Sequence, residues 1–459
     1  MERVFKLPPT RSDMYDAAKE VHATLVSRGY RAFMVGGCVR DMVLGETPHE
    51  YDIATSATPE EIASLFPRTI PVGASFGVVL VIHKGFKFEV ATFRRDEGYS
   101  DGRHPDRVSY SPDEREDVRR RDFTINALLY DPVAEQAIDY VGALEDIKEG
   151  VIRAIGKPED RFEEDRLRML RAVRFSARLG FRIEEGALRA IRQLAPLIAT
   201  VSRERIRDEI VRIITQKNPG VGLRLMLDLG LLKYLLPDVA GMAGVPQPQE
   251  YHPEGDVFTH TCLVLDYLRD YTLENRGEAP TPELAMGALL HDVGKPPTFS
   301  ITDRIRFNGH DKVGAAMAQR ICMELRFSKK QTHRISELVR HHLKFKDVFY
   351  MRRSTLRRFL AMPHFEDHLA LHYADCMGSH RELETYEFVK QKLEEYKETD
   401  IKPKPLLSGD DLIAMGYKPG PIFSEILRQV EEAQLQGDLR DKESAKSMVR
   451  ELFPLDLGA

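Results

Sequence analysis

The stretch that decides the expected fold runs from residue 36 to residue 55 and reads GGCVRDMVLGETPHEYDIAT. It follows Tyr30–Val35, an apolar segment that predicts a short buried strand. Gly36 and Gly37 come directly after this strand and let the backbone approach a phosphate closely. The helix expected next offers its N-terminus and Arg40 to an anion. Taken alone, the pattern also fits an ordinary tight turn with a surface arginine.

Three carboxylates follow at spacings that suit metal binding. Glu50 and Asp52 are two residues apart in a strand-like segment, so a period of two puts both on one face. Glu89 lies in a further strand-like segment, Phe86–Phe93. Carboxylates on neighbouring strands are costly to bury without a compensating cation, and hard oxygen ligands suit Mg²⁺. Each carboxylate alone also fits an edge-strand charge that faces water.

Composition excludes several classes of protein. The 459 residues are 42% hydrophobic and 30% charged, which excludes a largely disordered chain. No apolar run approaches the ~18 residues needed to cross a bilayer, and the start MERVFKLPPTRSDM has no apolar signal core. We therefore expect no membrane partner and no export. Four separated cysteines without a CxxC pair fit a cytoplasmic location, and with a net charge of −5 any nucleic-acid surface must be local.

The expected domain order is one mixed α/β domain followed by a long helical series. Strand-like segments stop near residue 157, and helical patterns dominate from Pro158 onward. The polar residues 94–119, which include Gly, Pro, Asp and Ser, predict a long mobile loop, and loops of this length are usually functional or disordered. The expected domains are 1–157, 158–240, 241–397 and 398–459.

One helical pattern, over residues 163–179, carries charges suited to base recognition. Asp165 and Arg168 are three residues apart, so a helix makes them neighbours, and Arg171 and Arg174 follow. An aspartate acceptor beside an arginine donor fork complements the edge of a nucleobase, and further arginines can hold a triphosphate. The competing interpretation is a solvated helix with ion pairs.

Seven motifs, taken together and in order, resemble the class II tRNA nucleotidyltransferase/poly(A) polymerase family. They are GGCVRD, HEYDIATSATPEE, KFEVATFRRD, YSDGRHPD, RRDFTINAL, DYVGALEDI and EDRLRMLRAVRFSARLGF. The resemblance covers about residues 30–240 and extends more loosely to LLSGDDLIAMGYKPGPIFSEIL near the C-terminus. It implies an α+β, polymerase-beta-like nucleotidyltransferase domain followed by an elongated all-α series of neck, HD body and tail.

The resemblance also implies an activity, two substrates and a set of roles. The family adds C, C and A to tRNA 3′ ends from CTP and ATP without a nucleic-acid template. The implied catalytic Mg²⁺ ligands are Glu50, Asp52 and Glu89. The implied nucleotide contacts are Gly36, Gly37, Arg40, Arg121, Asp122, Asp165, Arg168, Arg171 and Arg174. Asp101 and Arg103 resemble the family's flexible element for switching from C to A.

Motif A departs from the family pattern, which has Asp-x-Asp where this chain has Glu50-x-Asp52. Glutamate is one methylene longer, and Mg²⁺ demands near-ideal octahedral distances, so Glu50 is the least certain ligand. The intact loop motif argues against an enzyme that adds only C. Three alternatives stay open: an A-adding enzyme, a poly(A) polymerase, and a hydrolase with a weakened transferase domain. The oligomeric state is also open.

Histidines of the second half predict another metal site. The series H…HD…D, with Gly294-Lys295 beside the HD pair, resembles the HD-domain phosphohydrolases. The candidate residues are His260, His291, Asp292, His310, His341 and Asp375. A divalent transition metal or Mg²⁺ there would activate water for phosphoester hydrolysis. By resemblance the activity is 2′,3′-cyclic phosphodiesterase or phosphatase, and the alternative is a degenerate helical body.

Overall fold

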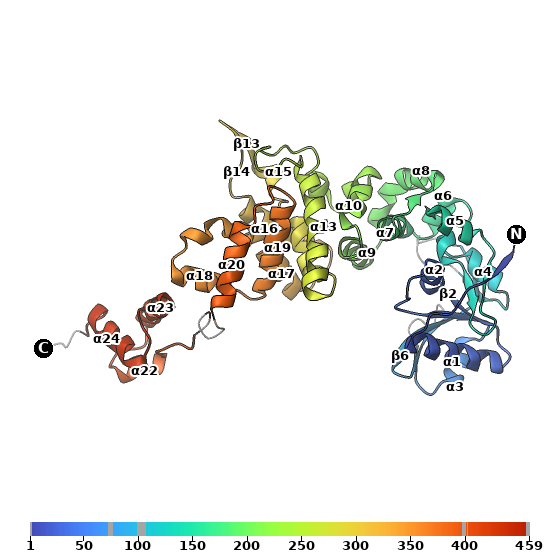
Figure 1. Ribbon diagram of the computed structural model, residues 1–459, viewed down its shortest axis with the longest axis horizontal. Helices are drawn as coiled ribbons and strands as arrows, with labels where there is room; N and C mark the ends of the chain where they lie inside the picture. Colours follow the sequence, from blue (N-terminus) through green and yellow to red (C-terminus); the bar gives the residue numbers. More distant parts are fainter. Residues whose placement is uncertain (1, 72–76, 99–106, 397–400, 402, 456–459) are drawn as a thin grey trace. The chain divides into compact units, whose positions relative to one another are not determined.

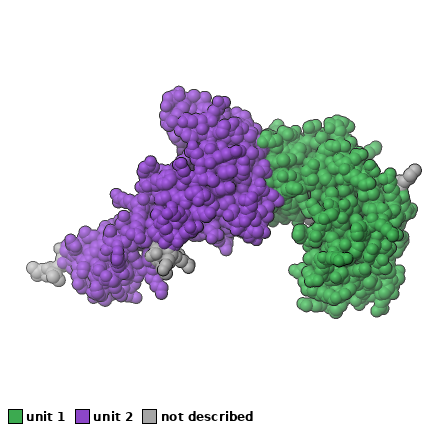
Figure 2. All heavy atoms as spheres, in the orientation of Figure 1, with its two compact units in different colours: residues 1–240, 324–326 green, residues 241–323, 327–459 purple. Residues whose placement is uncertain are grey.

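The computed structural model describes residues 2–71, 77–98, 107–396, 401 and 403–455 and divides the chain into two compact units. The first comprises residues 1–240 with 324–326, and the second comprises 241–323 and 327–459 (Figure 2). The expected fold class is confirmed, because a mixed α+β head precedes a largely helical series. No described helix combines the length and hydrophobicity that crossing a membrane requires. The four-domain division stays a prediction.

The first unit is built on a mixed sheet in the order β1-β10-β9-β2-β3-β6-β5-β4 (Figure 1). β3 runs parallel to β6, and the other neighbouring strands are antiparallel. The strands are β1 (Arg3–Lys6), β2 (Ala32–Val35), β3 (Asp52–Thr55), β4 (Thr69–Pro71), β5 (Val78–His83), β6 (Phe86–Thr92), β9 (Leu129–Asp131) and β10 (Gln136–Asp139).

Short helices surround this sheet. They are α1 (Asp13–Ser27), α2 (Gly37–Val43), α3 (Pro59–Leu65), α4 (Glu114–Arg119), η2 (Thr124–Asn126) and α5 (Ala143–Glu149). Ser12 caps α1 by accepting from the amide of Tyr15, and Thr58 with Glu61 closes a capping box on α3. Both helices pack on the sheet, α1 on β2 and β6 and α3 on β5 and β6.

The helices that follow within the first unit correct one prediction. They are α6 (Pro158–Glu164), α7 (Arg168–Leu179), α8 (Glu185–Leu194), η3 (Ala195–Thr200), α9 (Arg203–Thr215), α10 (Pro219–Asp228), α11 (Leu231–Leu235) and α12 (Pro237–Ala240). The single helix predicted over residues 163–179 is wrong, because residues 165–167 separate α6 from α7. A small parallel pair, β11 (Val151–Ile152) and β12 (Arg182–Ile183), also lies here.

The expected loop over residues 94–119 contains regular structure at both ends. β7 (Arg94–Glu97) pairs antiparallel with β8 (Arg107–Tyr110), and α4 follows with Asp113 as its cap. The predicted switching residues Asp101 and Arg103 lie outside the described residues, so their role stays a prediction.

Over its described residues, the second unit is helical apart from one hairpin, β13 (Phe299–Ile301) and β14 (Ile305–Phe307). Its helices are α13 (Val257–Arg276), α14 (Pro282–Leu290), α15 (Lys295–Thr298), α16 (His310–Glu324), α17 (Lys329–His341), η4 (His342–Tyr350), α18 (Arg353–Leu360), α19 (Phe365–Met377), α20 (Glu384–Glu395), α22 (Gly409–Ala414), α23 (Pro421–Gln436) and α24 (Lys442–Leu452). α13, α14, α17 and α19 pack against one another. The histidine series lies on α13, just after α14, at the start of α16 and at the start of η4.

Candidate functional site

The glycine turn gathers three of the predicted residues of the first unit. β2 ends at Val35, whose register partner on β3 is Asp52. Gly36 follows with a φ of 80°, which L side chains rarely adopt. An added Cβ at this position would lie 3.7 Å from the Asp52 carboxylate and 3.8 Å from the guanidinium of Arg121. The turn at the start of α2 therefore lies close to both a carboxylate and a guanidinium.

Asp52 and Glu89 are neighbours because β3 and β6 pair in parallel with Ile53 opposite Val90. Burial raises the pKa of Asp52 to about 7, the charges of Glu50 and Glu89 add to this rise, and Arg121 opposes it. The set therefore carries an excess of negative charge on hard oxygen atoms. That donor chemistry fits a divalent cation such as Mg²⁺.

Glu50 lies just before β3, which begins at Asp52, so Glu50 is outside the strand expected to hold both carboxylates. The side chain of Tyr51 is buried, and its hydroxyl lies 2.7 Å from that of Thr10. This contact anchors the segment between the two carboxylates. Glu50 itself is exposed, yet its charge acts on the pKa of Asp52.

Arg40 is buried beneath the turn rather than free on the surface. Its guanidinium donates to the Asp41 carboxylate at 2.9 and 2.6 Å and to the side-chain oxygen of Asn126 at 2.6 Å. An added Cβ on Gly37 would lie 3.4 Å from its Nη2 atom, so the guanidinium lies close to the turn. The predicted phosphate contact of Arg40 stays a prediction.

Asp122 and Arg171 form a tight pair between the head and α7. Nε and Nη2 of Arg171 lie 2.7 and 2.6 Å from Oδ2 of Asp122. Burial alone would raise the pKa of Asp122, but Arg171 and Arg168 outweigh it and lower this pKa to about 2. The guanidinium of Arg171 also lies 5.3 Å from the centre of the Phe175 ring.

The expected Asp165–Arg168 pair is not on one helix. Asp165 is the C-cap of α6 and Arg168 is the first residue of α7, because the helix is broken between them. The Asp165 carboxylate accepts from Arg205 on α9 at 2.8 Å. Arg168 donates to Glu164 at 2.7 Å and to the carbonyl oxygen of Arg120. The two side chains therefore have other partners, and their role in base recognition stays a prediction.

Arg174, predicted to assist with a triphosphate, is 7% exposed and donates to Glu209 at 2.8 Å. Burial lowers the pKa of Arg174 to about 10 although the charge of Glu209 raises it. Sequence reasoning missed both Glu209 and Arg205. The sequence did contain an indication for Glu209. This residue lies on the same face of α9 as the apolar residues Ile206, Ile210 and Ile213, so it is expected to be buried and to need a charged partner.

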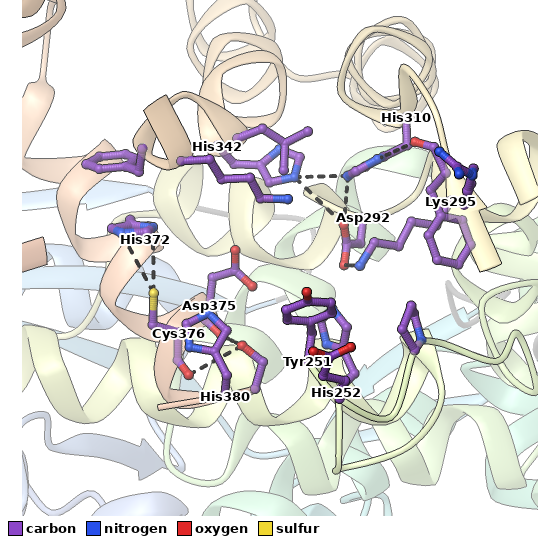
Figure 3. Close-up of a pocket in the computed structure, with 18 of the residues that line it drawn as sticks. Tyr251, His252, Asp292, Lys295, His310, His342, His372, Asp375, Cys376 and His380 are labelled. Carbon is purple, nitrogen blue, oxygen red and sulfur yellow. Dashed lines mark hydrogen bonds and ion pairs between the residues drawn. The ribbon is translucent and has the colours of Figure 1, made fainter. Parts of the chain in front are cut away.

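The second unit brings the histidine series together around Asp292. Figure 3 shows two of these residues, His310 and His342, beside the Asp292 carboxylate. Oδ2 of Asp292 lies 3.2 Å from Nε2 of His291 and 3.8 Å from Nε2 of His260. Oδ1 lies 3.4 Å from Nε2 of His310 and 3.8 Å from Nε2 of His342. The carboxylate therefore lies between two groups of imidazole nitrogens.

Three of these rings are oriented in the same way. Nδ1 of His291, His310 and His342 lies 2.7, 2.8 and 2.6 Å from the backbone oxygens of Ala288, Phe307 and Val339. These contacts assign the proton to Nδ1 and leave the lone pair of Nε2 toward Asp292. Imidazoles held in this way, around a buried carboxylate, fit a divalent metal ion.

His260 and Asp375 complete the cluster. Nε2 of His260 lies 3.0 Å from Oδ1 of Asp375 and 3.3 Å from Nε2 of His291. Burial would lower the pKa of His260, but Asp375 and Glu254 raise it to about 9. Lys295 lies 2.6 Å from Oδ2 of Asp292 and donates to Gln247. The structure thus brings together His260 on α13, His291 and Asp292 just after α14, His310 at the start of α16 and Asp375 on α19.

The predicted His341 is not in this cluster, and His342 takes the place assigned to it. His341 contacts Glu337 at 3.2 Å, one turn back on α17, whereas His342 is one of three residues with converging ligand atoms around Asp292. The sequence held a signal for this choice. Ile335, Leu338 and Val339 form the buried face of α17, and the same spacing continues to His342.

A cavity of about 790 Å³ opens beside the cluster. Asp292, His310, His342 and Asp375 lie in its wall, opposite the half-exposed ring of Tyr251 (Figure 3). The hairpin and η4 contribute Arg304, Arg306 and Lys346. The volume exceeds that of a phosphate and suits a nucleotide-sized ligand.

Family models match four stretches of the chain. Residues 32–153 match the poly A polymerase head domain, and 180–242 match a probable RNA and SrmB-binding site of polymerase A. Residues 257–363 match the HD domain, and 311–446 match a putative second domain of tRNA nucleotidyltransferases. The chain is thus similar to the poly A polymerase head domain over residues 32–153. The resemblance drawn from the motifs is therefore confirmed.

Relatives agree with this assignment. The CCA-adding enzyme of Lactiplantibacillus plantarum is 44% identical over 221 residues, which are 48% of this chain and 54% of that protein. The one of Lactobacillus helveticus is 41% identical over 55% of this chain and 61% of its own length. The matched stretch thus spans little more than half of each relative.

Solved structures match over nearly the whole length. The Bacillus stearothermophilus CCA-adding enzyme in complex with CTP has a TM-score of 0.73 at 27% identity, covering 96% of this chain and 98% of that one. The Thermotoga maritima CCA-adding enzyme complexed with tRNA has a TM-score of 0.62 at 20% identity, covering 98% and 99%. The second likeness shows the fold alone.

Proposed function

We propose that the chain adds CCA, or its terminal A, to tRNA 3′ ends from CTP and ATP without a nucleic-acid template. The observation that carries the proposal is the parallel register that sets Asp52 beside Glu89, next to the turn at Gly36 and to Arg121. Relatives and a structural neighbour that are named as CCA-adding enzymes support this reaction.

The residues around the turn at Gly36 have different roles in this reaction. The RNA 3′-hydroxyl oxygen bonds to the α-phosphorus of the incoming nucleotide, the bond to the bridging oxygen breaks, and pyrophosphate leaves as the hydroxyl proton passes to solvent. Gly36 and Gly37 give the phosphates close access to the backbone, and Arg121 offers positive charge. Asp52, Glu89 and Glu50 would hold Mg²⁺, which supplies charge neutralisation and hydroxyl activation when bound.

Extension of tRNA transcripts with labelled CTP or ATP tests this proposal and separates its alternatives. Addition of one A to a transcript ending in CC, without use of CTP, would favour an A-adding enzyme. Long A tails would favour a poly(A) polymerase. No incorporation would favour a hydrolase whose head only binds RNA or nucleotide.

The Glu50→Asp variant is expected to keep or raise the rate of incorporation. The shorter side chain restores the usual motif, and the exposed position of Glu50 leaves room for the change. Initial rates with ATP and a CC-ending transcript, measured over a range of Mg²⁺ concentrations, check the expectation. A loss of more than about tenfold in kcat/KM, or ~1.4 kcal/mol, would contradict the expectation that aspartate can replace Glu50 as a metal ligand.

As a second activity we propose metal-dependent phosphoester hydrolysis at the cluster around Asp292. The favouring observation is the convergence of four Nε2 atoms on its two oxygens. In a 2′,3′-cyclic phosphate, water would add to phosphorus while one ribose oxygen leaves and takes up a proton. Asp292 and the imidazoles would hold a divalent ion, which supplies an activated water when bound. Arg304 and Lys346 in the cavity wall offer charge to a phosphate.

The adjacent histidines of η4 and α17 provide a matched test. The His342→Ala variant is expected to lose affinity for Mn²⁺ or Co²⁺ by about 10- to 100-fold, because a converging ligand is removed. The His341→Ala variant should bind either ion like the unaltered chain. Titration of metal-free protein measures both, and hydrolysis of 2′,3′-cyclic AMP is measured in parallel. Equal effects of the two substitutions would contradict the assignment.

A further inference from the structure

The short segment before α13 places a carboxylate between two histidines at the edge of the metal-binding cluster. Oε1 of Glu254 lies 2.8 Å from Nδ1 of His252 and 2.8 Å from Nδ1 of His260. The Glu254 side chain is 8% exposed. The three residues are one of the groups whose potential ligand atoms converge.

His260 differs from the other histidines of the cluster in what holds its Nδ1 atom. His291, His310 and His342 each have a backbone oxygen three residues earlier at 2.6–2.8 Å. For His260 the nearest backbone oxygen in hydrogen-bond contact is that of Gly378, and it lies 3.3 Å away. The closer acceptor is the Glu254 carboxylate, at 2.8 Å. A charged acceptor gives a stronger hydrogen bond and makes the opposite ring nitrogen a better ligand.

We propose that Glu254 is a positioning residue for the metal centre of the second unit, and that His252 holds Glu254 in place. Glu254 accepts the Nδ1 proton of His260 and so keeps Nε2 of that ring directed at Asp292 and Asp375. His252, at the cavity wall, donates its Nδ1 proton to the same oxygen and fixes the carboxylate. This inference rests on the proposed metal-dependent hydrolase site.

Cobalt titration of the full-length, metal-free chain tests the proposal without relying on activity. We expect Glu254→Ala to weaken Co²⁺ binding by about 10- to 100-fold and to change the visible absorption spectrum of the bound ion. The Glu254→Gln variant keeps the size of the side chain and an acceptor oxygen but loses the charge, so it should lose less Co²⁺ affinity. If Glu254→Ala does not fold, Glu254→Gln is tested in its place. Glu250→Gln is the matched control, because Glu250 is exposed in the wall of the same cavity.

The outcomes separate this inference from the proposed hydrolase function. Unchanged Co²⁺ affinity and spectrum in both Glu254 variants would overturn the positioning role and leave the hydrolase proposal intact. An equal loss in Glu250→Gln would also overturn it, because the effect would not be specific to the residue that contacts His260. If the unaltered chain binds no Co²⁺ at the cluster, the hydrolase proposal and this inference both fail.

Discussion

The Asp52→Asn variant is expected to lose nucleotide incorporation almost completely, by on the order of 10³-fold or more in kcat/KM. Asparagine keeps the shape of the side chain but removes the charge that a divalent ion would need. Burial and two neighbouring carboxylates raise the pKa of Asp52 to about 7, so this side chain lies where a cation would compensate most charge. Incorporation of labelled ATP into a CC-ending transcript measures the effect.

A matched exposed residue controls for unspecific effects of this substitution. Asp16 lies on α1 in the same unit and is exposed, so Asp16→Asn should leave incorporation within about twofold of the unaltered chain. Because Asp52 has a raised pKa without a cation, its neutral replacement should not lower the thermal unfolding temperature of the metal-free chain. An Asp52→Asn protein that incorporates nucleotide at the normal rate would contradict the metal-ligand assignment.

The Asp292→Asn variant is expected to abolish hydrolysis of 2′,3′-cyclic AMP, again by on the order of 10³-fold, and to spare nucleotide incorporation. Both oxygens of Asp292 face imidazole nitrogens. This carboxylate therefore belongs to two groups of potential ligands, one with His260 and His291 and one with His310 and His342. Its loss also leaves Lys295 without its 2.6 Å ionic partner. Hydrolysis of 2′,3′-cyclic AMP and nucleotide incorporation are measured in parallel on one preparation of the variant and compared with the unaltered chain.

The pair of variants forms a double test. Asp52→Asn should hydrolyse the cyclic phosphate normally, and Asp292→Asn should extend tRNA normally, because each residue belongs to a different unit. Loss of both activities in either variant would contradict two separate sites. Asp311→Asn, in the first turn of α16 at a partly exposed position, serves as the control for the second unit.

Local patterns predicted most of the elements around the first site. The β-branched segments and the glycine turn depend on neighbours in sequence, and both appear in the structure. The parallel pairing of β3 with β6, which sets Asp52 beside Glu89, is a long-range contact whose direction the sequence did not predict. The break between α6 and α7 was not predictable from periodicity, because residues 163–179 keep a helical pattern throughout. Asp165 instead caps α6 and finds Arg205, a partner 40 residues away.

The remaining differences between prediction and structure arise from side chains that pair over long distances in the sequence. Burial of Arg40 against Asn126 and pairing of Arg174 with Glu209 depend on how helices pack, which residue spacing does not encode. The choice between His341 and His342 was different, since the apolar spacing of α17 already favoured His342. Glu254 was not singled out because its importance lies in the contact with His260, which only the folded chain shows.

The proposed nucleotidyltransferase function is best tested by extension of three tRNA transcripts, which end at the discriminator base, at C and at CC. Each is incubated with Mg²⁺ and the purified chain, and with labelled CTP, labelled ATP or both. We expect the shortest transcript to gain C, C and one A and then stop, or the CC-ending transcript to gain a single A. Absence of incorporation on all three transcripts, with the unaltered chain folded and Mg²⁺ present, would contradict the proposed nucleotidyltransferase function.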